Sequence, residues 1–331
     1  MKPPPPTING VGPSTVWLPQ HGQEKWPTVL DFLVHRFATL TRDEIAGRML
    51  RGEITDDDGL AVPHDAAYTA NRKLHYYRMV LDEPRIPFEE AILYEDELLL
   101  AVDKPHFLPT IPGGRYVQET LLVRLKQKLG LASLAPMHRL DRETAGVVLF
   151  TKQLQHRGAY QLLFQQRQVN KQYLAVAPWR DDVPLPMTCR SRIVVSDHFM
   201  RMCETPGAPN AETSIELLAR HGQLGQYRLT PLTGKKHQLR VHMAALGLPI
   251  VYDQIYPRHV AAGEGDMGRP LQLLAQSINF TDPVTGMHRQ FVSRRRLLHW
   301  HDNEHTSEGG CNPPSSTTVG CTHSTHYPHT N

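Results

Sequence analysis

The chain has 331 residues, 40% of them hydrophobic, and a formal net charge of +3. Its length and composition are those of a globular protein with one large domain or two ordinary ones. No apolar run is long enough to cross a bilayer, and the start "MKPPPPTINGVGPSTVWLP" lacks the apolar centre of a signal peptide. These features exclude a membrane-spanning class and predict a cytoplasmic protein.

The first 85 residues predict a loose start and a small domain. Residues 1–26 are rich in proline and polar side chains and are expected to be loose. Residues 27–85 are expected to form the small domain, with two short helices and a strand that ends in an Asp-Gly turn. Thr41 is the expected N-cap of the second helix. The residues expected to face inward are Val29, Leu30, Leu33, Phe37 and Leu40 on the first helix and Ile45, Ala46, Met49 and Leu50 on the second.

From residue 86 onward, predicted strands outnumber helices. The expected strands are "AILYED", "ELLLAVDKP", "GVVLF", "KQYLAVAP", "RIVVS", "ETSIELLAR", "QYRLTPLT" and "LQLLAQSINF", and the first two read as a hairpin. The expected helices are "QETLLVRLKQKLG", "QLQHRGAYQLLFQQRQV" and "KKHQLRVHMAALG". This order predicts an α+β fold over residues 86–300, a mostly antiparallel mixed sheet with flanking helices, beside the small N-terminal α/β domain. Residues 301–331 have few large apolar side chains and are predicted to be a disordered tail.

The cysteines predict neither disulfides nor a metal centre. The four residues, Cys189, Cys203, Cys311 and Cys321, form no CxxC pair. In a cytoplasmic protein they are expected to be reduced, unpaired thiols. Cys311 and Cys321 lie near histidines, but at a spacing that matches no zinc module. We therefore predict no metal. A resemblance described below implies that no small-molecule cofactor is needed, and we expect a monomer.

Basic residues gather locally although the net charge is small. The clusters are "NRKLHYYR", "GKKHQLRVH" and "SRRR". Local basic patches can bind a polyanion while the whole chain stays near neutral, and scattered solvated faces are the alternative interpretation. The candidate contacts are Lys235, Lys236, Arg294, Arg295 and Arg296 in the larger domain and Arg42, Arg48, Arg51, Arg72 and Lys73 in the small one.

Charged residues stand directly before a buried strand in "APMHRLDRETAGVVLF", residues 135–150. Asp141 lies between Arg139 and Arg142, and nearby positive charge favours the ionised form of a carboxylate. An ionised aspartate at the start of a strand can act as a nucleophile, a base or a salt-bridge partner. These residues alone leave all three roles open.

Two further stretches carry groups that suit the same site. Lys171 and Tyr173 lie on a strand that we expect beside the first one, where a tyrosine offers a ring to stack on a base and a hydroxyl to move a proton. Lys236 and Arg240 are four residues apart, on one face of the predicted helix, with His237 beside them. Such groups near a helix N-terminus suit phosphate or carboxylate. A core tyrosine and a solvated helix face are the alternatives.

Taken together, these stretches resemble pseudouridine synthases of the RluA type. The similarity spans residues 90 to about 298, with its motifs in order and sensibly spaced. Residues 27–85 resemble the small RNA-binding domain of bacterial ribosomal small-subunit protein four, which accompanies many members of this family. The motifs that carry the resemblance are "ILYEDELLLAVDKPHFLPTIPG", "MHRLDRETAGVVLFTK", "KQYLAVAPW", "TGKKHQLRVHMAALGLPIVYDQIY" and "LLAQSINFTDPVTG".

The resemblance implies roles for individual residues. Asp141 matches the family's essential aspartate, Tyr173 the tyrosine that stacks on the target base and is credited with proton transfer at carbon 5, and Arg240 the basic residue that pairs with the aspartate. Arg139 matches the arginine that helps fill the space left by the extruded nucleotide, and Leu239 lines the base pocket. The other expected substrate-binding residues are His138, Thr144, Lys171, Lys235, Lys236 and His237.

The implied reaction breaks the bond between ribose and uracil nitrogen, turns the base and rejoins it through carbon. Asp141 would attack the anomeric carbon or remove the 2′ proton, and the sequence leaves both routes open. The expected partner is RNA, first of all large-subunit ribosomal RNA, because relatives with the small domain often modify it; transfer RNA is the alternative. Two other classes remain: a catalytically silent RNA-binding assembly factor, and an unrelated acid/base hydrolase that uses Glu143 as a second carboxylate.

Overall fold

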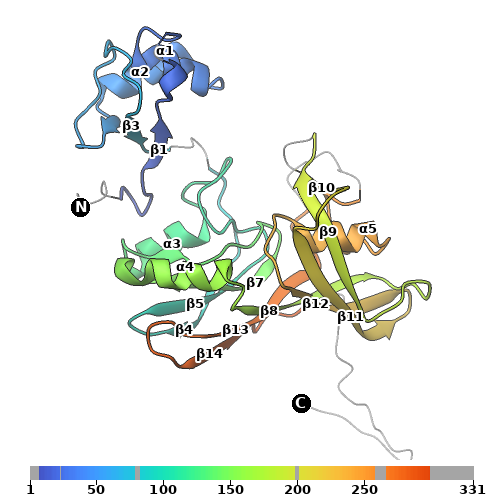
Figure 1. Ribbon diagram of the computed structural model, residues 1–331. Coiled ribbons are helices and arrows are strands. Elements are labelled where there is room, and N and C mark those ends of the chain that lie inside the picture. The colour runs from blue at the N-terminus through green and yellow to red at the C-terminus, as the bar shows by residue number, and fades with distance from the viewer. Residues whose placement is uncertain (1–6, 23, 79–82, 198–200, 258–265, 299–331) are drawn as a thin grey trace, which may run out of the picture. The chain divides into compact units, whose positions relative to one another are not determined.

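The computed structural model describes most of the chain up to residue 298. The described residues are 7–22, 24–78, 83–197, 201–257 and 266–298 (Figure 1). The predicted tail, residues 301–331, lies outside them, as do Cys311 and Cys321. Within the described part, the structure has no helix long and apolar enough to span a membrane.

A large mixed sheet of eleven strands organises the chain from Ala91 onward. Its continuous path is β10–β9–β11–β12–β8–β13–β7–β5–β4, with β14 paired to β13 and β6 to β7. Among the described residues, the pairing of β13 with β7 is parallel and the other pairings are antiparallel. The strands are β4 (Ala91–Glu95), β5 (Leu99–Lys104), β6 (Ala135–Pro136), β7 (Ala145–Thr151), β8 (Asn170–Pro178), β9 (Met187–Val195), β10 (Met202–Thr205), β11 (Ala211–His221), β12 (Leu224–Pro231), β13 (Leu273–Thr281) and β14 (His288–Val292).

This sheet confirms the predicted α+β class with mostly antiparallel pairing. One expectation about neighbours is wrong, because β8 does not lie directly beside β7. Strand β13 separates them and pairs with both. No pattern in the residues indicated this insertion, since β13 comes about a hundred residues after β8 in the chain.

Two helices cover opposite faces of β5 and β7, which explains why these strands read as continuous apolar runs. Leu100 and Val102 of β5 pack with α3 (Leu121–Leu129), while the alternating residues Leu99 and Ala101 pack with α4 (Arg157–Gln165). Successive side chains of a strand point to opposite faces, so both sets are buried. Helix α3 ends at Gly130 in a left-handed conformation, as predicted, and the short 3₁₀ helix η2 (Leu154–His156) precedes α4.

Helix α5 (Gln238–Ala245) covers the other half of the sheet, where it contacts β9, β10 and β11 (Figure 1). Its Leu239 and Met243 pack against Ala175 of β8 and Tyr227 of β12 in one apolar cluster. The two halves of the sheet meet along the neighbouring strands β8, β13 and β7. These strands carry the site described below.

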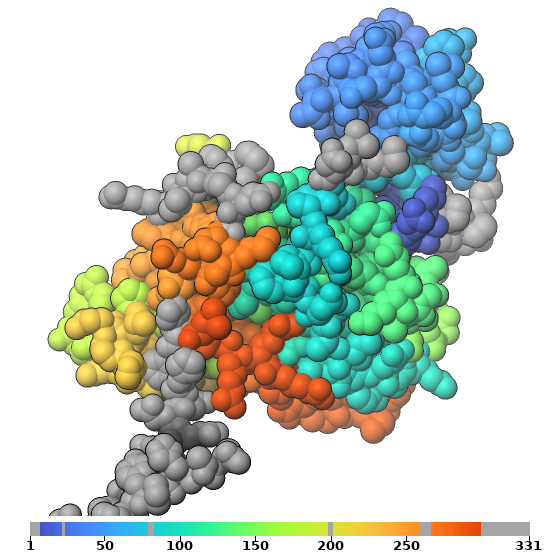
Figure 2. All heavy atoms as spheres, turned by 180° about the vertical axis from the view of Figure 1, so that it is seen from behind, coloured from blue at the N-terminus to red at the C-terminus, as the bar shows by residue number. Residues whose placement is uncertain are grey.

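The basic stretch after β14 lies against the first strands of the sheet. Figure 2 shows this red-orange segment in contact with the teal residues of the β4–β5 region. The hydroxyl of Ser293 donates a hydrogen bond to Asp103, and the guanidinium of Arg295 donates to the carbonyl oxygens of Glu89 and Asp103. Arg295 is thus a structural link, whereas Arg294 and Arg296 are exposed.

The N-terminal module, residues 14–78, packs two helices on a small antiparallel sheet. Helices α1 (Val29–Arg36) and α2 (Arg42–Leu50) contact each other, and the sheet order is β1–β3–β2, with η1 (Gln20–Gly22) after the first strand. The strands are β1 (Ser14–Trp17), β2 (Ile54–Asp56) and β3 (Lys73–Tyr76). Thr28 and Thr41 each close a capping box at a helix start, so the predicted cap at Thr41 is confirmed.

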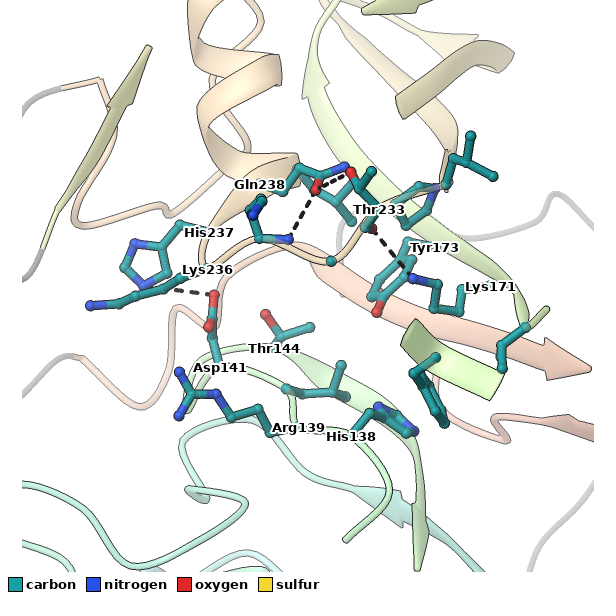
Figure 3. A pocket seen from close by; sticks show the side chains of 18 of the residues that line it. His138, Arg139, Asp141, Thr144, Lys171, Tyr173, Thr233, Lys236, His237 and Gln238 are labelled. Atoms are coloured by element: carbon teal, nitrogen blue, oxygen red, sulfur yellow. Dashed lines mark hydrogen bonds and ion pairs between the residues drawn. The ribbon is translucent and has the colours of Figure 1, made fainter. Parts of the chain in front are cut away.

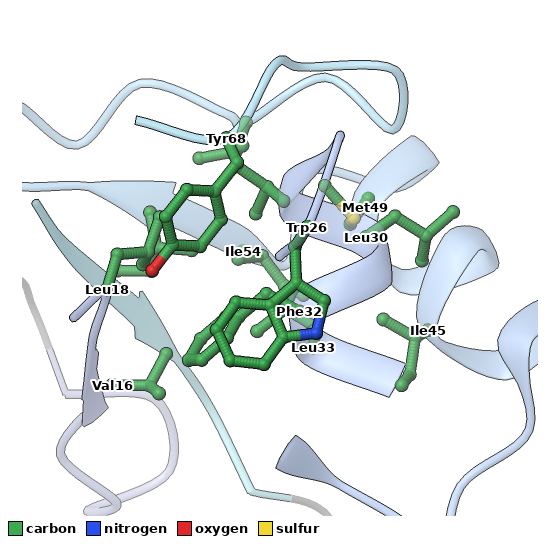
Figure 4. Close-up of a cluster of buried hydrophobic side chains, with 13 residues drawn as sticks. Val16, Leu18, Trp26, Leu30, Phe32, Leu33, Ile45, Met49, Ile54 and Tyr68 are labelled. Carbon is green, nitrogen blue, oxygen red and sulfur yellow. The ribbon is translucent and has the colours of Figure 1, made fainter. Parts of the chain in front are cut away.

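The expectation that residues 1–26 are loose is wrong for their second half. Strand β1 pairs with β3, and Val16, Leu18 and Trp26 are buried in the core of the module (Figure 4). The Trp26 ring contacts Phe32 edge-on, with ring centres 5.1 Å apart. Prolines and polar residues around these few large apolar side chains masked their role in the sequence.

One inward prediction on α2 is also wrong. Leu50 is 70% exposed, whereas Ile45 and Met49 are buried. Leu50 is the last residue of the helix, one position after Met49, and a step of one residue turns a side chain by about a quarter of a helical turn, away from the core.

Candidate active site

A cavity of about 430 Å³ opens between three segments of the large domain and one residue of β13 (Figure 3). The segments are residues 137–144, 164–173 and 231–240, together with Leu273. All eleven residues that the sequence analysis named as catalytic or substrate-binding line this cavity. They come from three stretches far apart in the sequence, so the fold brings the residues of these separate motifs together in one site.

A tight turn before β7 presents Asp141 to the cavity. The backbone N–H of Thr144 donates to the carbonyl oxygen of Asp141, at 3.2 Å, and the chain then enters β7. Gly146 has φ +114°, and a Cβ there would lie 2.2 Å from the carbonyl oxygen of Ala275 on β13. The close approach of β7 to β13 therefore requires glycine at this position, five residues after the carboxylate.

Asp141 meets two basic side chains at long range. Its Oδ2 lies 3.4 Å from Nη1 of Arg240 and 3.8 Å from Nε2 of His237. The Asp141 side chain is 28% exposed, while that of Arg240 is 1% exposed. The carboxylate is thus held by charge without being enclosed, and it keeps lone pairs that face the cavity.

The two arginines that flank Asp141 in the sequence form no ion pair with it among the described residues. Arg142 donates to Glu143 at 3.0 Å and to the hydroxyl of Tyr116 at 3.2 Å, and its guanidinium lies over the Tyr116 ring. Consecutive residues at a turn point in different directions, so Arg142 leaves the cavity. Arg139 does line the cavity, and Figure 3 shows it beside Asp141.

Arg240 is fixed by a second aspartate that the sequence analysis missed. Its Nε and Nη2 donate to the two oxygens of Asp253 at 2.8 and 2.7 Å, and the Asp253 side chain is fully buried. Burial alone would lower the pKa of Arg240, but Asp253, Asp141 and Glu143 raise it above its usual value. Asp253 lies in the quoted stretch "VYDQIY", thirteen residues after Arg240, and this spacing follows no helical or strand period that would have indicated contact.

Glu143, the carboxylate of the alternative hydrolase hypothesis, does not line the cavity. It pairs with Arg142 and lies 3.8 Å from Arg240. Burial would raise the pKa of Glu143, but the two arginines lower it below its usual value. A carboxylate that is ionised, paired and outside the cavity is poorly suited to act as the second acid or base of a hydrolase.

Helix α5 starts later than predicted, which corrects the placement of Lys236. The helix begins at Gln238, and His237 is its N-cap in a left-handed conformation with φ 56°. Lys236 therefore lies in the preceding loop, not on a helical face with Arg240. The side-chain amide of Gln238 stabilises this loop: its oxygen accepts from the Thr233 hydroxyl and the Lys235 backbone N–H, at 2.7 and 3.0 Å.

His237 connects the loop to another part of the fold. Its Nδ1 lies 3.0 Å from the hydroxyl of Tyr256, whose backbone N–H donates to Asp253. Burial lowers the pKa of His237, although Asp141 acts in the opposite direction. The imidazole is therefore neutral at neutral pH, and the turn at Asp253–Tyr256 positions both side chains that approach Asp141.

Strand β8 contributes Lys171 and Tyr173 to the same wall of the cavity (Figure 3). Burial raises the pKa of the Tyr173 phenol, and the charge of Asp141 raises it further, so the phenol stays protonated at neutral pH. Nζ of Lys171 lies 3.4 Å from the carbonyl oxygen of Thr233. Burial lowers the pKa of Lys171.

His138 faces the cavity as a neutral ring. Its Nε2 accepts a hydrogen bond from the backbone N–H of Leu149 at 3.2 Å, and its ring stacks on Phe164 with centres 5.1 Å apart. Burial, with a further contribution from Lys171, lowers the pKa of His138 to about 3. Any contact of His138 with a substrate would thus be through its ring rather than through charge.

A separate cluster joins Cys189, Glu204 and His242, whose potential ligand atoms lie within 4.8 Å of one another. Burial and the nearby Glu204 raise the pKa of the Cys189 thiol to about 11, so it is not a thiolate at neutral pH. Nε2 of His242 lies 3.0 Å from the Ser191 hydroxyl, and Nδ1 lies 2.9 Å from that of Thr213. These contacts join α5 to β9 and β11.

Comparison with known proteins identifies relatives over most of the large domain. Residues 98–245 match the family model described as RNA pseudouridylate synthase. The chain is 31% identical over 233 residues to an uncharacterised RNA pseudouridine synthase of Synechocystis, covering 69% of this chain and 79% of the relative. It is 33% identical over 224 residues to the dual-specificity RNA pseudouridine synthase RluA of Haemophilus influenzae, covering 63% and 95%.

A solved structure shares the fold. The human protein titled RNA pseudouridylate synthase domain containing 1 superposes with a TM-score of 0.52 at 23% identity, covering 64% of this chain and 86% of that one. At this identity the likeness concerns the fold alone. The matched family region begins after the N-terminal module, so the resemblance of residues 27–85 to a ribosomal-protein domain stays a prediction.

Proposed function

The chain belongs to the RNA pseudouridylate synthase family, whose members are isomerases, and we propose that it converts specific uridines of structured RNA to pseudouridine with Asp141 as its catalytic carboxylate. The supporting observation is the position of this side chain. Asp141 is the one carboxylate in the lining of the cavity, within the described residues, and it lies 3.4 Å from a buried guanidinium.

The arrangement around Arg240 supports an electrostatic role. Because Asp253 binds the guanidinium through two hydrogen bonds, Arg240 stays in place whether or not Asp141 changes its own bonding. Both attack on the anomeric carbon and removal of the 2′ proton require the carboxylate form of Asp141, and a fixed positive charge lies beside it. Preorganised charge of this kind needs no rearrangement during the reaction.

Tyr173 fits a role as platform and proton relay. A ring on this wall can stack on the detached uracil and hold it while it turns. After the bond between ribose and carbon 5 has formed, the base must lose the proton of carbon 5, and Asp141 is again a carboxylate. We assign the phenol oxygen the role of taking this proton while its own proton passes to Asp141, because a neutral phenol can accept one proton only as it gives up another. A cavity water is the alternative acceptor.

Flipping the uridine out of folded RNA costs a few kcal/mol, and contacts to phosphates offset this cost. Lys235 and Lys236, in the exposed loop before α5, are candidate contacts. For the RNA class, we propose large-subunit ribosomal RNA first and transfer RNA second. The relatives include a dual-specificity RNA pseudouridine synthase, so a search for the target has to cover both.

The central test compares two aspartate variants in cells that encode this chain. Pseudouridine is mapped in ribosomal and transfer RNA from cells with Asp141→Asn, with the exposed Asp181→Asn as control. We expect one or more sites to lose pseudouridine in the Asp141 variant and to stay modified in the control. Identical maps would refute the assignment, and rescue of every cellular defect by Asp141→Asn would favour the silent assembly factor.

A second variant tests Tyr173. Phenylalanine keeps the ring but removes the hydroxyl, so Tyr173→Phe should bind target RNA normally and isomerise it about 10²–10⁴-fold more slowly, the range of a lost general acid–base group. Release of tritium from RNA labelled at uridine carbon 5 measures this step. A rate close to that of the wild type would exclude the phenol and favour water.

A further inference from the structure

We propose that the end of the cavity formed by Arg167 and Lys171 is a second subsite, which binds the phosphate of a nucleotide that flanks the target uridine. We call it the phosphate subsite. The inference rests on the proposed function and goes beyond it by assigning a recognition site to residues away from Asp141. Four observations lead to it: the charge of the cavity, the donors of Lys171, the backbone at Arg167, and the surface between and beside them.

The cavity holds more positive charge than the isomerisation itself needs. Its lining contains six lysine and arginine side chains and one carboxylate: Arg139, Arg167, Lys171, Lys235, Lys236 and Arg240 against Asp141. Arg240 pairs with Asp141, and none of the other five forms an ion pair with a carboxylate among the described residues, although Arg167 interacts with Glu212 at longer range. A wall with such an excess of cations attracts a polyanion. The phosphates of the target uridine alone would leave some of these cations unpaired, so phosphates of neighbouring nucleotides are expected to bind there as well.

Lys171 has donors to offer. Its ammonium carries three N–H groups, and the structure gives it one acceptor, the carbonyl oxygen of Thr233 at the long distance of 3.4 Å. A half-buried cation with unsatisfied donors is costly, and an anion in the cavity would offset this cost. Lys171 and Tyr173 are two residues apart on β8, so they face the same side, about 7 Å apart along the strand. One nucleotide step can span that separation.

Arg167 occupies an unusual backbone position for its type. It follows α4 with φ 58°, a left-handed conformation that glycine adopts at lower cost. Its backbone N–H donates to the carbonyl oxygen of Phe164, and the side chain is exposed at the rim of the cavity. A non-glycine residue in this region is strained. Packing does not explain arginine here, because the side chain is not buried, whereas phosphate binding does.

The surroundings give this subsite a neutral floor and an apolar edge. The stacked rings of His138 and Phe164 carry no charge at neutral pH, so the cations at this end are Arg167 and Lys171. Leu232, also in the lining, is 46% exposed. It suits contact with the ribose or base that carries the bound phosphate.

The test pairs protein variants with neutral phosphates. A target hairpin is prepared with a single methylphosphonate at each position flanking the uridine in turn, and its affinity is measured for the wild type, Arg167→Ala and Lys171→Met. Arg228→Ala is the matched control, because Arg228 is an exposed arginine that pairs with Glu216 away from the cavity. Lys171→Arg, which keeps the charge, guards against loss of folding.

The expected result is a coupled loss at one position. Arg167→Ala and Lys171→Met should each bind the native hairpin about tenfold more weakly, as for a lost charge-assisted hydrogen bond. A methylphosphonate at one position should weaken binding to the wild type by the same factor and should weaken binding to the two variants no further. Arg228→Ala should behave as the wild type. Independent, additive losses at every position would overturn the subsite, as would normal affinity of both variants. A wild type that binds and discriminates phosphates but isomerises no uridine would instead contradict the proposed function.

Discussion

The N-terminal module and the cavity use their cations in opposite ways. In the module, four of the five residues predicted to contact RNA lie within 3.0 Å of a carboxylate. The pairs are Arg42–Asp31, Arg48–Glu53, Arg51–Glu53 and Arg72–Asp56. In the cavity, no ion pair with a carboxylate is found among the described residues for Arg139, Arg167, Lys171, Lys235 and Lys236, although Arg167 interacts with Glu212 at longer range. Two regions that look equally basic in sequence therefore differ in net charge.

This difference shows how basic clusters should be weighed. A cation contributes to RNA affinity by displacing counterions from phosphate, and a nearby carboxylate cancels much of that attraction. Asp31 also closes the capping box of α1 with Thr28, so the same side chain that fixes the helix start neutralises Arg42. The module holds together through its apolar core, and its charges lie at the surface. The cavity gathers cations that are not paired with carboxylates, and its geometry depends on a few buried contacts such as Arg240–Asp253.

The largest expected effect comes from removing the partner of the one enclosed cation in the cavity. Asp253→Asn leaves Arg240 buried without its bidentate partner, and breaking a buried ion pair typically costs about 3–5 kcal/mol of folding free energy. Isomerisation should also fail, because Arg240 would no longer be held at Asp141. Urea denaturation and an isomerisation assay measure the two losses.

The matched control for this prediction is Asp56→Asn in the module, whose partner Arg72 is exposed to solvent. An exposed pair contributes only about 0–1 kcal/mol, although Asp56 also accepts hydrogen bonds from the backbone of its turn. If the two variants lose similar stability, the contrast between buried and surface charge is wrong.

The sequence predicted the cavity better than it predicted the contacts within it. Periodicity and β-branched content located the strands, and the motifs named eleven residues that line one cavity. The sequence did not reveal which side chains pair with each other. Arg142 and Asp141 are neighbours in the chain but point apart, and Asp253 contacts Arg240 through a turn with no regular period. Contacts made by a loop depend on where the fold places the two ends of that loop, which local sequence patterns do not show.

The same limit applies to the start of the chain and to α5. Proline and polar residues predicted a loose segment at 1–26, yet Leu18 and Trp26 complete the core of the module. At α5, continuous helix formers suggested a start near Lys235, but the left-handed backbone of His237 delays it to Gln238. In both cases a tertiary contact outweighs local propensity: packing of Trp26 in one, and the bond from His237 to Tyr256 in the other.

An effect that is smaller per pH unit should appear as a pH dependence of stability at Lys104, a fully buried cation beneath the Asp141 turn. Its Nζ donates to the carbonyl oxygens of Pro105, Leu108 and Arg142, at 2.7–3.1 Å. Burial lowers the pKa of Lys104 to about 7, although Glu143 and Asp141 act in the opposite direction. The unfolded chain binds this proton up to a pH of about 10.5, so between these values it holds more protons than the folded protein.

The free energy of unfolding should therefore rise with pH from about 7 to about 10.5, by at most about 1.4 kcal/mol per pH unit, and this gain is lost as pH falls to 7. Urea denaturation at several pH values, for the wild type and for Lys104→Met, measures the slope. The variant should lack this component, and Lys128→Met, an exposed lysine on α3, should keep it. Parallel curves for the wild type and Lys104→Met would contradict a titrating buried lysine.

The smallest effect tests the comparison most directly, through the salt dependence of RNA affinity. Replacing Lys235 and Lys236 with alanine removes two exposed, unpaired cations from the cavity, whereas replacing Arg42 and Arg72 removes two that are paired. Each lost phosphate contact lowers the slope of log affinity against log salt by about 0.7–0.9. We expect a fall of that size per residue for the lysine pair and almost none for the arginine pair, although both variants lose the same formal charge.

Equal falls would mean that the module binds RNA through its paired arginines, so that Asp31 and Asp56 give way to phosphate on binding. A fall for the arginine pair alone would reverse the comparison and make the module the main RNA-binding surface.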